Sequence, residues 1–177
     1  SPAEVVEEIE AALHQFKPEG FGFVDSVFNY PLDHCQEILE EIIRRPWKAR
    51  FTTMGVSPKN LDSQFLHLMQ RAGFTSFMIS PESASETMLA SYQKGFDSED
   101  LRRAASAINR FSFPVLWNFL IGGPGETNRT LEETLDFIEH YLVRTPGPPH
   151  NLANIFLGVR IYPGTRLWQI ALEENFV

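Results

Sequence analysis

Short apolar segments alternate along the chain with longer segments in which apolar residues recur every three or four positions. The apolar segments have the length of buried strands, and the periodic segments have the spacing of helices with one buried face. We expect strands at 20–25, 50–54, 75–80, 114–121 and 154–161, separated by helices. Strands that are short, apolar and alternate with helices are typical of a parallel sheet covered by helices on its outer side.

Polar residues mark where several helices begin. A serine or threonine three residues before a glutamate can form a capping box at a helix N-terminus. The pattern occurs at Ser1–Glu4, Ser83–Glu86 and Thr130–Glu133. In the helix that we expect to begin near Thr130, the buried line is predicted to be Leu131, Leu135, Ile138 and Leu142. The proline-rich stretch 146–149 predicts a loop.

Five strand-helix units in a row predict the overall architecture. Right-handed crossovers taken repeatedly in one direction give a curved parallel sheet with helices on its convex face, which is a partial (βα) barrel. A doubly wound sheet is the weaker alternative, because residues 24–29 lack the glycine pattern that follows its first strand. We therefore expect one α/β domain over residues 1–177.

The carboxyl ends of the predicted strands carry polar residues and turns. Ligands of a parallel barrel bind at these ends, so Asp25, Ser80, Glu82 and Arg160 become candidates for ligand contact. The most informative end is the segment 119–127, where an apolar strand runs into Gly-Gly-Pro-Gly-Glu-Thr. Glycines bare the backbone for close approach of a ligand, although a tight turn also requires them for conformational reasons alone. The candidates in this turn are Gly122, Gly123 and Glu126.

Composition narrows the functional classes. The chain is 43% hydrophobic but has no apolar run long enough to cross a bilayer, and its first ten residues are acidic rather than signal-like. A net charge of -8 argues against nucleic-acid binding. The single cysteine, Cys35, excludes an internal disulfide and fits a reducing compartment. We therefore expect a cytoplasmic protein that does not contact membranes.

Four motifs in order suggest a family. They are Phe23-Val24-Asp25-Ser26-Val27-Phe28-Asn29, Pro81-Glu82-Ser83-Ala84-Ser85, Gly122-Gly123-Pro124-Gly125-Glu126-Thr127 and Arg160-Ile161-Tyr162-Pro163-Gly164-Thr165. Together they resemble the radical S-adenosylmethionine (radical SAM) superfamily, and within it the branch whose members often carry a cobalamin-binding domain. The resemblance covers essentially the whole chain.

The resemblance implies a six-stranded partial barrel with two cofactors. A [4Fe-4S] cluster, held by three cysteines in a CxxxCxxC loop after the first strand, cleaves S-adenosylmethionine (SAM) to a 5'-deoxyadenosyl radical. Cys35 stands alone and is expected on the apolar side of a helix, so we predict no metal ligand and no catalytic residue in this chain. We expect the chain to lack the first strand and the cluster loop, and to be inactive by itself.

The resemblance also implies roles for individual residues. Glu82 matches the position that bonds the ribose or the amino group of SAM, although Ser80 and Pro81 precede it in place of the commoner Gly-x-Glu-Ser context. The Gly122, Gly123 and Glu126 positions match the motif that supports adenine and the methionine end of SAM.

Arg160 and Asp25 match positions with less specific roles. Arg160 matches a cavity-facing position that can hold the methionine carboxylate or a substrate anion, and Asp25 matches the end of the strand beside the cluster. For both residues an ion pair between strands inside the barrel is an equal alternative.

Two functional classes remain open from the sequence. The first is part of the catalytic barrel of a radical SAM enzyme, with a small-molecule substrate that the sequence does not identify and with cobalamin as a further cofactor in some relatives. The second is a non-catalytic partial barrel that binds a nucleotide-like metabolite. In either class the strand at 20–25 has no neighbour on one side, so we predict self-association through this edge or poor solution behaviour.

Overall fold

The computed structural model describes residues 1–111, 113–145 and 150–175, and the loop predicted at 146–149 lies outside this part of the chain. In the described residues, five strands form one sheet in the order β1-β2-β3-β4-β5, and every neighbouring pair is parallel. The strands are β1 (Phe21–Phe23), β2 (Phe51–Thr53), β3 (Phe74–Glu82), β4 (Val115–Ile121) and β5 (Asn151–Leu157). This arrangement confirms the predicted α/β class and parallel sheet.

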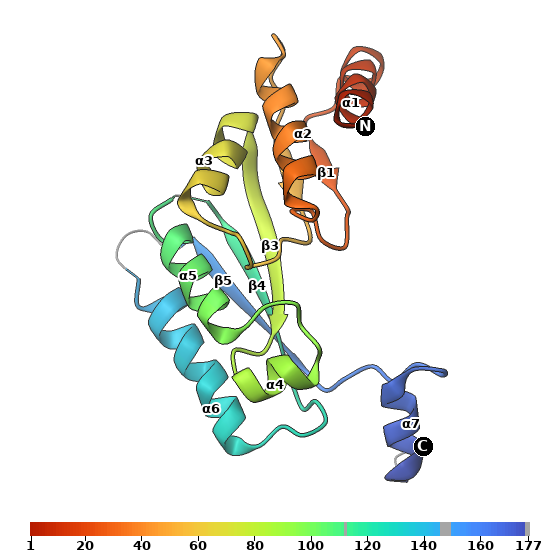
Figure 1. Ribbon diagram of the computed structural model, residues 1–177, viewed down its shortest axis with the longest axis vertical. Coiled ribbons are helices and arrows are strands. Elements are labelled where there is room, and N and C mark those ends of the chain that lie inside the picture. Colours follow the sequence, from red (N-terminus) through yellow and green to blue (C-terminus); the bar gives the residue numbers. More distant parts are fainter. Residues whose placement is uncertain (112, 146–149, 176–177) are drawn as a thin grey trace.

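Helices connect the strands and cover one face of the sheet (Figure 1). They are α1 (Pro2–Phe16), α2 (Leu32–Arg44), α3 (Ser63–Ala72), α4 (Glu86–Ser91), α5 (Ser98–Ile108), α6 (Asn128–Phe137), a π-helix η1 (Ile138–Val143) and α7 (Arg166–Glu173). Neighbouring helices contact each other in the sequence α1, α2, α3, α5 and η1, so the outer layer follows the strand order. Figure 1 shows the short α4 at the end of β3 and α7 set apart from the layer at the C-terminus.

The core lies between this helical layer and the sheet. The alternate residues Phe77, Ile79 and Pro81 of β3 are buried, and Trp117 and Phe119 of β4 continue the same layer. The intervening residues of both strands are only half-buried, because they point to the concave face. The two-residue alternation therefore assigns Ser80 and Asn118 to the concave face, where a ligand would bind.

Several strand boundaries differ from the predicted ones. The first two strands are three residues each, shorter than predicted, and β3 extends to Glu82. The last strand, β5, spans Asn151–Leu157 instead of 154–161, so Arg160 lies beyond its end. The length of a strand depends on how far it pairs with its neighbour, and the apolar pattern of one segment carries no information about that pairing.

Two of the three predicted capping boxes are not formed. Ser1 and Glu4 form the first as predicted. The short helix α4 has Ser85 as its N-cap residue, without a side-chain cap, and the Ser83 hydroxyl is used elsewhere. The helix predicted to begin near Thr130 begins at Asn128, because Thr127 caps it and Thr130 occupies the third position.

The earlier start also changes the buried face of α6. The predicted line included Leu135, but this side chain is 43% exposed, and the buried residues are Thr130, Thr134 and Phe137. The continuation as the π-helix η1 brings Ile138 and Leu142 back to the buried side, as predicted. The face of α6 toward the loops of the sheet is therefore formed by hydroxyls rather than by leucines.

Candidate functional site at the carboxyl ends of the strands

Two adjacent cavities open at the carboxyl ends of the strands. The first has a volume of about 710 Å³ and is lined by loops after β1 and β2 together with Ser80, Glu82 and Lys94. The second has a volume of about 460 Å³ and is lined by Glu82, Tyr92, Lys94, Pro124 and Arg160, with residues of α7 on one side. Glu82 and Lys94 line both cavities, so this pair of charges lies where the two meet.

Glu82 occupies an unusual backbone conformation. Its φ angle is 62°, in the left-handed region that costs a side-chain-bearing residue about 1 kcal/mol or more. The register between β3 and β4 also shifts between Ile79 and Glu82, which is the signature of a bulge. The sharp turn ends β3 and places the Glu82 carboxylate in both cavities.

Lys94 is held beside this carboxylate. Its ammonium group forms an ion pair with Glu82 and donates a hydrogen bond to the Ser80 carbonyl oxygen at 3.1 Å. Both side chains are mostly buried, with 24% of Lys94 and 31% of Glu82 exposed. Burial lowers the pKa of Lys94, because desolvation disfavours the charged ammonium. The ion pair is therefore partly desolvated, so leaving either Glu82 or Lys94 charged without a partner would cost free energy.

The glycine-rich turn after β4 is closed by its own carboxylate. The Gly122 N–H donates to the Glu126 carboxylate at 2.5 Å, and Gly122 has a φ of 95° that favours glycine. Gly123 is in contact with Tyr92, since a Cβ atom at this position would lie 1.9 Å from the Tyr92 hydroxyl oxygen. Glycine is required at 123 because the tyrosine occupies the space of a side chain.

Tyr92 brings an unpaired hydroxyl to the same place. Within the described residues its hydroxyl oxygen is buried and has no hydrogen-bond partner. Burial raises the pKa of Tyr92, and the nearby Glu126 carboxylate raises it further. The phenol therefore stays neutral and can donate a hydrogen bond.

A row of polar side chains crosses the concave face below the cavities. Asn118 donates to the Ser80 hydroxyl at 3.0 Å, and Asn154 donates to the Asn118 side-chain oxygen at 3.3 Å. The row runs over β3, β4 and β5, and its Ser80 end lies in the larger cavity. These amides give the barrel interior a neutral polar surface.

The predicted site residues are brought together to different degrees. Ser80, Glu82 and Arg160 line the cavities. The glycine-rich turn lies next to the smaller cavity, because its Pro124 and the adjacent Tyr92 line that cavity. Gly122, Gly123 and Glu126 belong to this turn. Asp25 is exposed and lines neither cavity, although the next residues, Ser26 and Val27, do. Among the described residues neither Asp25 nor Arg160 forms an ion pair, so an interstrand ion pair, the equal alternative to ligand contact for each residue, is not seen there.

Cys35 is buried on α2, as predicted. Its burial raises the pKa of the thiol to about 12, and the Asp25 carboxylate contributes to the same shift. Because metals bind the thiolate, a thiol that stays protonated at neutral pH is suited to packing rather than to an iron-sulfur cluster.

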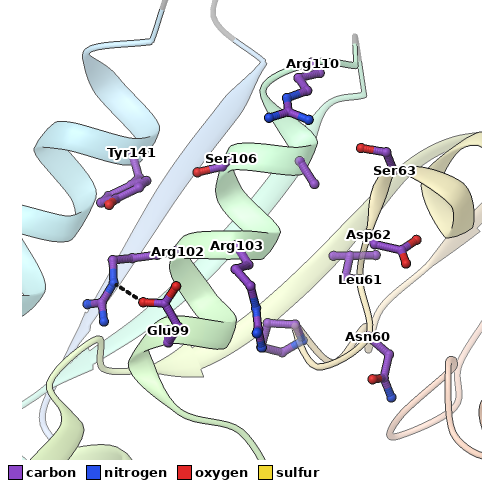
Figure 2. A pocket seen from close by; sticks show the side chains of 12 residues that line it. Asn60, Leu61, Asp62, Ser63, Glu99, Arg102, Arg103, Ser106, Arg110 and Tyr141 are labelled. Carbon is purple, nitrogen blue, oxygen red and sulfur yellow. Dashed lines mark hydrogen bonds and ion pairs between the residues drawn. The ribbon is translucent and has the colours of Figure 1, made fainter.

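A separate groove of about 670 Å³ lies on the outer helical layer, between α5 and the loop before α3 (Figure 2). Three arginines, Arg102, Arg103 and Arg110, line it. Two of them are paired with carboxylates of their own helix, Arg102 with Glu99 at 3.1 Å and Arg103 with Asp100. The groove is therefore close to charge balance, and it lies outside the strand ends.

One possible set of metal ligands lies on the outer layer as well. Asp136, Glu139 and His140 have ligand atoms within 4.8 Å of one another, and all three are exposed. The His140 ring nitrogen already contacts the Asp136 carbonyl oxygen at 2.8 Å, and Glu139 pairs with Arg144. These contacts satisfy the groups without a metal.

Sequence reasoning did not identify Lys94, Tyr92, Asn118 and Asn154. The asparagines could have been found, because they alternate with apolar residues in predicted strands and therefore face the concave side. Lys94 and Tyr92 follow a short helix whose end brings them back over the strand ends, and no local pattern specifies that return.

Comparisons with known proteins identify related sequences and structures. The family model "Radical SAM superfamily" matches residues 1–138. Among curated proteins, an uncharacterized methyltransferase of Pyrococcus horikoshii is 23% identical over 184 residues, covering 98% of this chain and 36% of the relative. A tryptophan 2-C-methyltransferase of Streptomyces laurentii is 28% identical over 145 residues, covering 75% of this chain and 24% of the relative. The chain thus spans about a quarter to a third of the length of these relatives.

Solved structures show the same fold. The radical SAM methyltransferase TsrM of Kitasatospora setae, with tryptophan and a SAM analogue bound, has a TM-score of 0.81 and 22% identity over 98% of this chain and 33% of that chain. OxsB, a cobalamin-dependent SAM radical enzyme, has a TM-score of 0.63 and 18% identity over 99% of this chain and 25% of that chain. None of the helices in the described residues has the length and apolarity that a membrane crossing requires. Since the family model covers most of the chain and the parallel half-barrel agrees with it, this chain belongs to the radical SAM superfamily.

Proposed function

We propose that this chain is the SAM-binding part of the catalytic barrel of a radical SAM enzyme. The observation that carries the proposal is the meeting of two cavities at Glu82 and Lys94, beside the glycine-rich turn that contains Gly122 and Gly123. Family membership favours this enzyme over the non-catalytic binding module. The relatives' names favour methyl transfer as the reaction class and cobalamin as a further cofactor of the whole protein.

The residues at the mouth fit the chemistry of SAM. The Glu82 carboxylate can accept hydrogen bonds from ribose hydroxyls or pair with the amino group, both of which are charge-assisted contacts. The exposed Gly122 backbone leaves room for a flat adenine or for the methionine chain, whereas Tyr92 fills the space in front of Gly123. The Arg160 guanidinium lines the same cavity and can bind the methionine carboxylate in a two-pronged way.

Lys94 has a defined part in this binding. Its ammonium group holds the Glu82 carboxylate, so a ligand that takes over this carboxylate must provide a new partner for Lys94. SAM can do this, because it carries an amino group for Glu82 and a carboxylate for Lys94. After this exchange both Glu82 and Lys94 keep an oppositely charged partner in a partly buried site.

The residues of this chain do not fit a [4Fe-4S] cluster. Such a cluster needs cysteine thiolates, whereas Cys35 is alone and its thiol is protonated at neutral pH. We therefore place the cluster ligands outside this chain. Bound there, the cluster would supply the electron that cleaves SAM to methionine and a 5'-deoxyadenosyl radical.

The test measures SAM affinity by titration calorimetry in the protein encoded by the complete reading frame. Glu82→Ala should weaken SAM binding by roughly 1–3 kcal/mol, which is about 5- to 150-fold, through loss of a charge-assisted hydrogen bond. Glu99→Ala is the matched control, because it breaks a glutamate-arginine pair on the outer groove, away from the cavities. An unchanged affinity in Glu82→Ala, or an equal loss in Glu99→Ala, would refute the assignment.

A further inference from the structure

Four buried hydroxyl-bearing residues lie directly behind Glu82. Ser83, Ser85, Thr130 and Thr134 are each at most 2% exposed. The Thr134 hydroxyl oxygen is 2.9 Å from the Ser83 hydroxyl oxygen, accepts the Ala84 N–H at 3.1 Å, and lies 3.2 Å from the Thr130 carbonyl oxygen. Ser83 in turn accepts the Ser85 N–H at 3.1 Å.

The number of hydroxyl protons determines which group donates in each hydrogen bond of this network. The Thr130 carbonyl oxygen can only accept a hydrogen bond, so the Thr134 hydroxyl donates its single proton there. The shared bond between the two hydroxyls must then use the proton of Ser83. Each hydroxyl proton of this pair is used once, and the two hydroxyl oxygens also accept the backbone N–H groups of Ala84 and Ser85.

The network joins the turn after Glu82 to helix α6. Ser83 to Ser85 follow Glu82 directly, while Thr134 belongs to α6, which begins immediately after the glycine-rich turn. Glu82 needs such support, because its left-handed φ of 62° is unfavourable for a residue with a side chain. A leucine at 134 would bury more apolar surface, but it could not hold the turn by hydrogen bonds.

We propose that Thr134 and Ser83 are positioning residues, which fix the direction of the Glu82 carboxylate and couple it to the glycine-rich turn. The inference rests on the proposed function, since it assigns them a role in SAM affinity and not only in stability. Neither residue lines a cavity at the strand ends.

The test compares Thr134→Val with Thr134→Ser in the protein from the complete reading frame. Valine keeps the shape and removes the hydroxyl, so SAM affinity should fall about five- to tenfold, the value of one or so hydrogen bonds; serine should restore most of it. Thr53→Val is the control, because Thr53 is a buried threonine whose hydroxyl has no hydrogen-bond partner among the described residues. It should leave SAM affinity unchanged.

A double-mutant cycle with Glu82→Ala separates positioning from general stability. If Thr134 acts through Glu82, Thr134→Val should weaken SAM binding no further in the Glu82→Ala background. The same loss in both backgrounds, or no loss in Thr134→Val alone, would overturn the inference while leaving the Glu82 assignment standing. An unchanged affinity in Glu82→Ala alone would refute the proposed function, and this inference with it. Ser83→Ala removes the same link from the other side, and it serves if Thr134→Val does not fold.

Discussion

At the scale of single residues, Tyr92 presents an unusual combination of burial and unsatisfied chemistry. Its hydroxyl is packed against Gly123 and has no hydrogen-bond partner in the described part of the chain. A buried hydroxyl without a partner costs free energy that a phenyl ring avoids. A bound ligand that accepts a hydrogen bond from the Tyr92 hydroxyl would remove this cost.

Tyr92→Phe should therefore leave the free energy of unfolding unchanged or raise it by up to about 1 kcal/mol. Denaturant unfolding of the ligand-free protein measures this directly. Tyr162→Phe, at an exposed tyrosine, is the control and should have no effect. A loss of more than about 1 kcal/mol in Tyr92→Phe would mean that the hydroxyl has a stabilising partner in the folded protein.

Cys35 predicts a pH dependence of stability. Its pKa is raised to about 12 in the folded protein from an ordinary value near 9, so the folded state keeps a proton that the unfolded state loses. The contribution is complete below pH 9 and declines by about 1.4 kcal/mol for each pH unit between 9 and 12. Denaturant unfolding of wild type and Cys35→Ala over this range should show a steeper decline for wild type. Parallel curves would contradict the pKa assignment.

Site residues could be predicted from the sequence where they lie at the carboxyl end of a predicted strand. Glu82, Ser80 and Arg160 lie at or near the carboxyl ends of predicted strands and were found for this reason, and the structure places all three at the cavities. Lys94 was not predicted, because its position depends on how α4 folds back over the sheet. Asp25 has the same position in the strand pattern as Glu82, yet its side chain lies outside the cavities, since the direction of a loop after β1 is set by contacts with the loop after β2.

At the scale of elements, the glycine-rich turn and α4 form one interlocked unit. Tyr92, at the end of α4, fills the space in front of Gly123. A Cβ atom at 123 would overlap the tyrosine, so the turn and the helix end must move together or not at all.

Gly123→Ala should lower the free energy of unfolding by about 1–3 kcal/mol and weaken SAM binding, because the turn and Tyr92 must separate. Gly22→Ala is the matched control, since Gly22 lines neither cavity and a Cβ atom at 22 would meet only the Thr52 hydroxyl oxygen at 3.5 Å, an ordinary contact distance. Thermal unfolding and calorimetry distinguish the two variants. Equal behaviour of both would show that Tyr92 yields without cost.

The helix α6 shows why its buried face was mispredicted. Periodicity assigned burial to Leu135, but the Thr127 cap starts the helix three residues earlier than expected, and threonines occupy the buried positions. Hydrophobic patterns identify apolar contacts, whereas this face serves hydrogen bonds to the loop after β3. Such a face can be identified only when the partner loop is known.

At the scale of the whole molecule, the strand order follows the sequence order and leaves β1 at one edge of the sheet. Its residues pair with β2 on one side in the described chain, and the adjacent Val24 is 80% exposed. An open edge beside an apolar side chain is a template for pairing with another strand. The strand order could be predicted from the alternation of strands and helices alone, because repeated parallel crossovers in one direction place each strand beside the one before it.

The isolated 177-residue chain should therefore self-associate through the β1 edge, and Val24→Lys should reduce the association by placing a charge there. Sedimentation velocity over a range of concentrations measures the distribution of species. Val143→Lys, the same substitution at an exposed valine of η1 away from the β1 edge, is the matched control and should leave the association unchanged. A monomer at every concentration would contradict the prediction.

The most direct test of the central claim is a structure of the protein from the complete reading frame with SAM bound. The account predicts SAM at the strand ends, with the Glu82 carboxylate bonded to its ribose or amino group and the Gly122–Gly123 backbone against the ligand. SAM bound in the outer groove beside α5, or at the strand ends without contact to Glu82 and the glycine-rich turn, would contradict it.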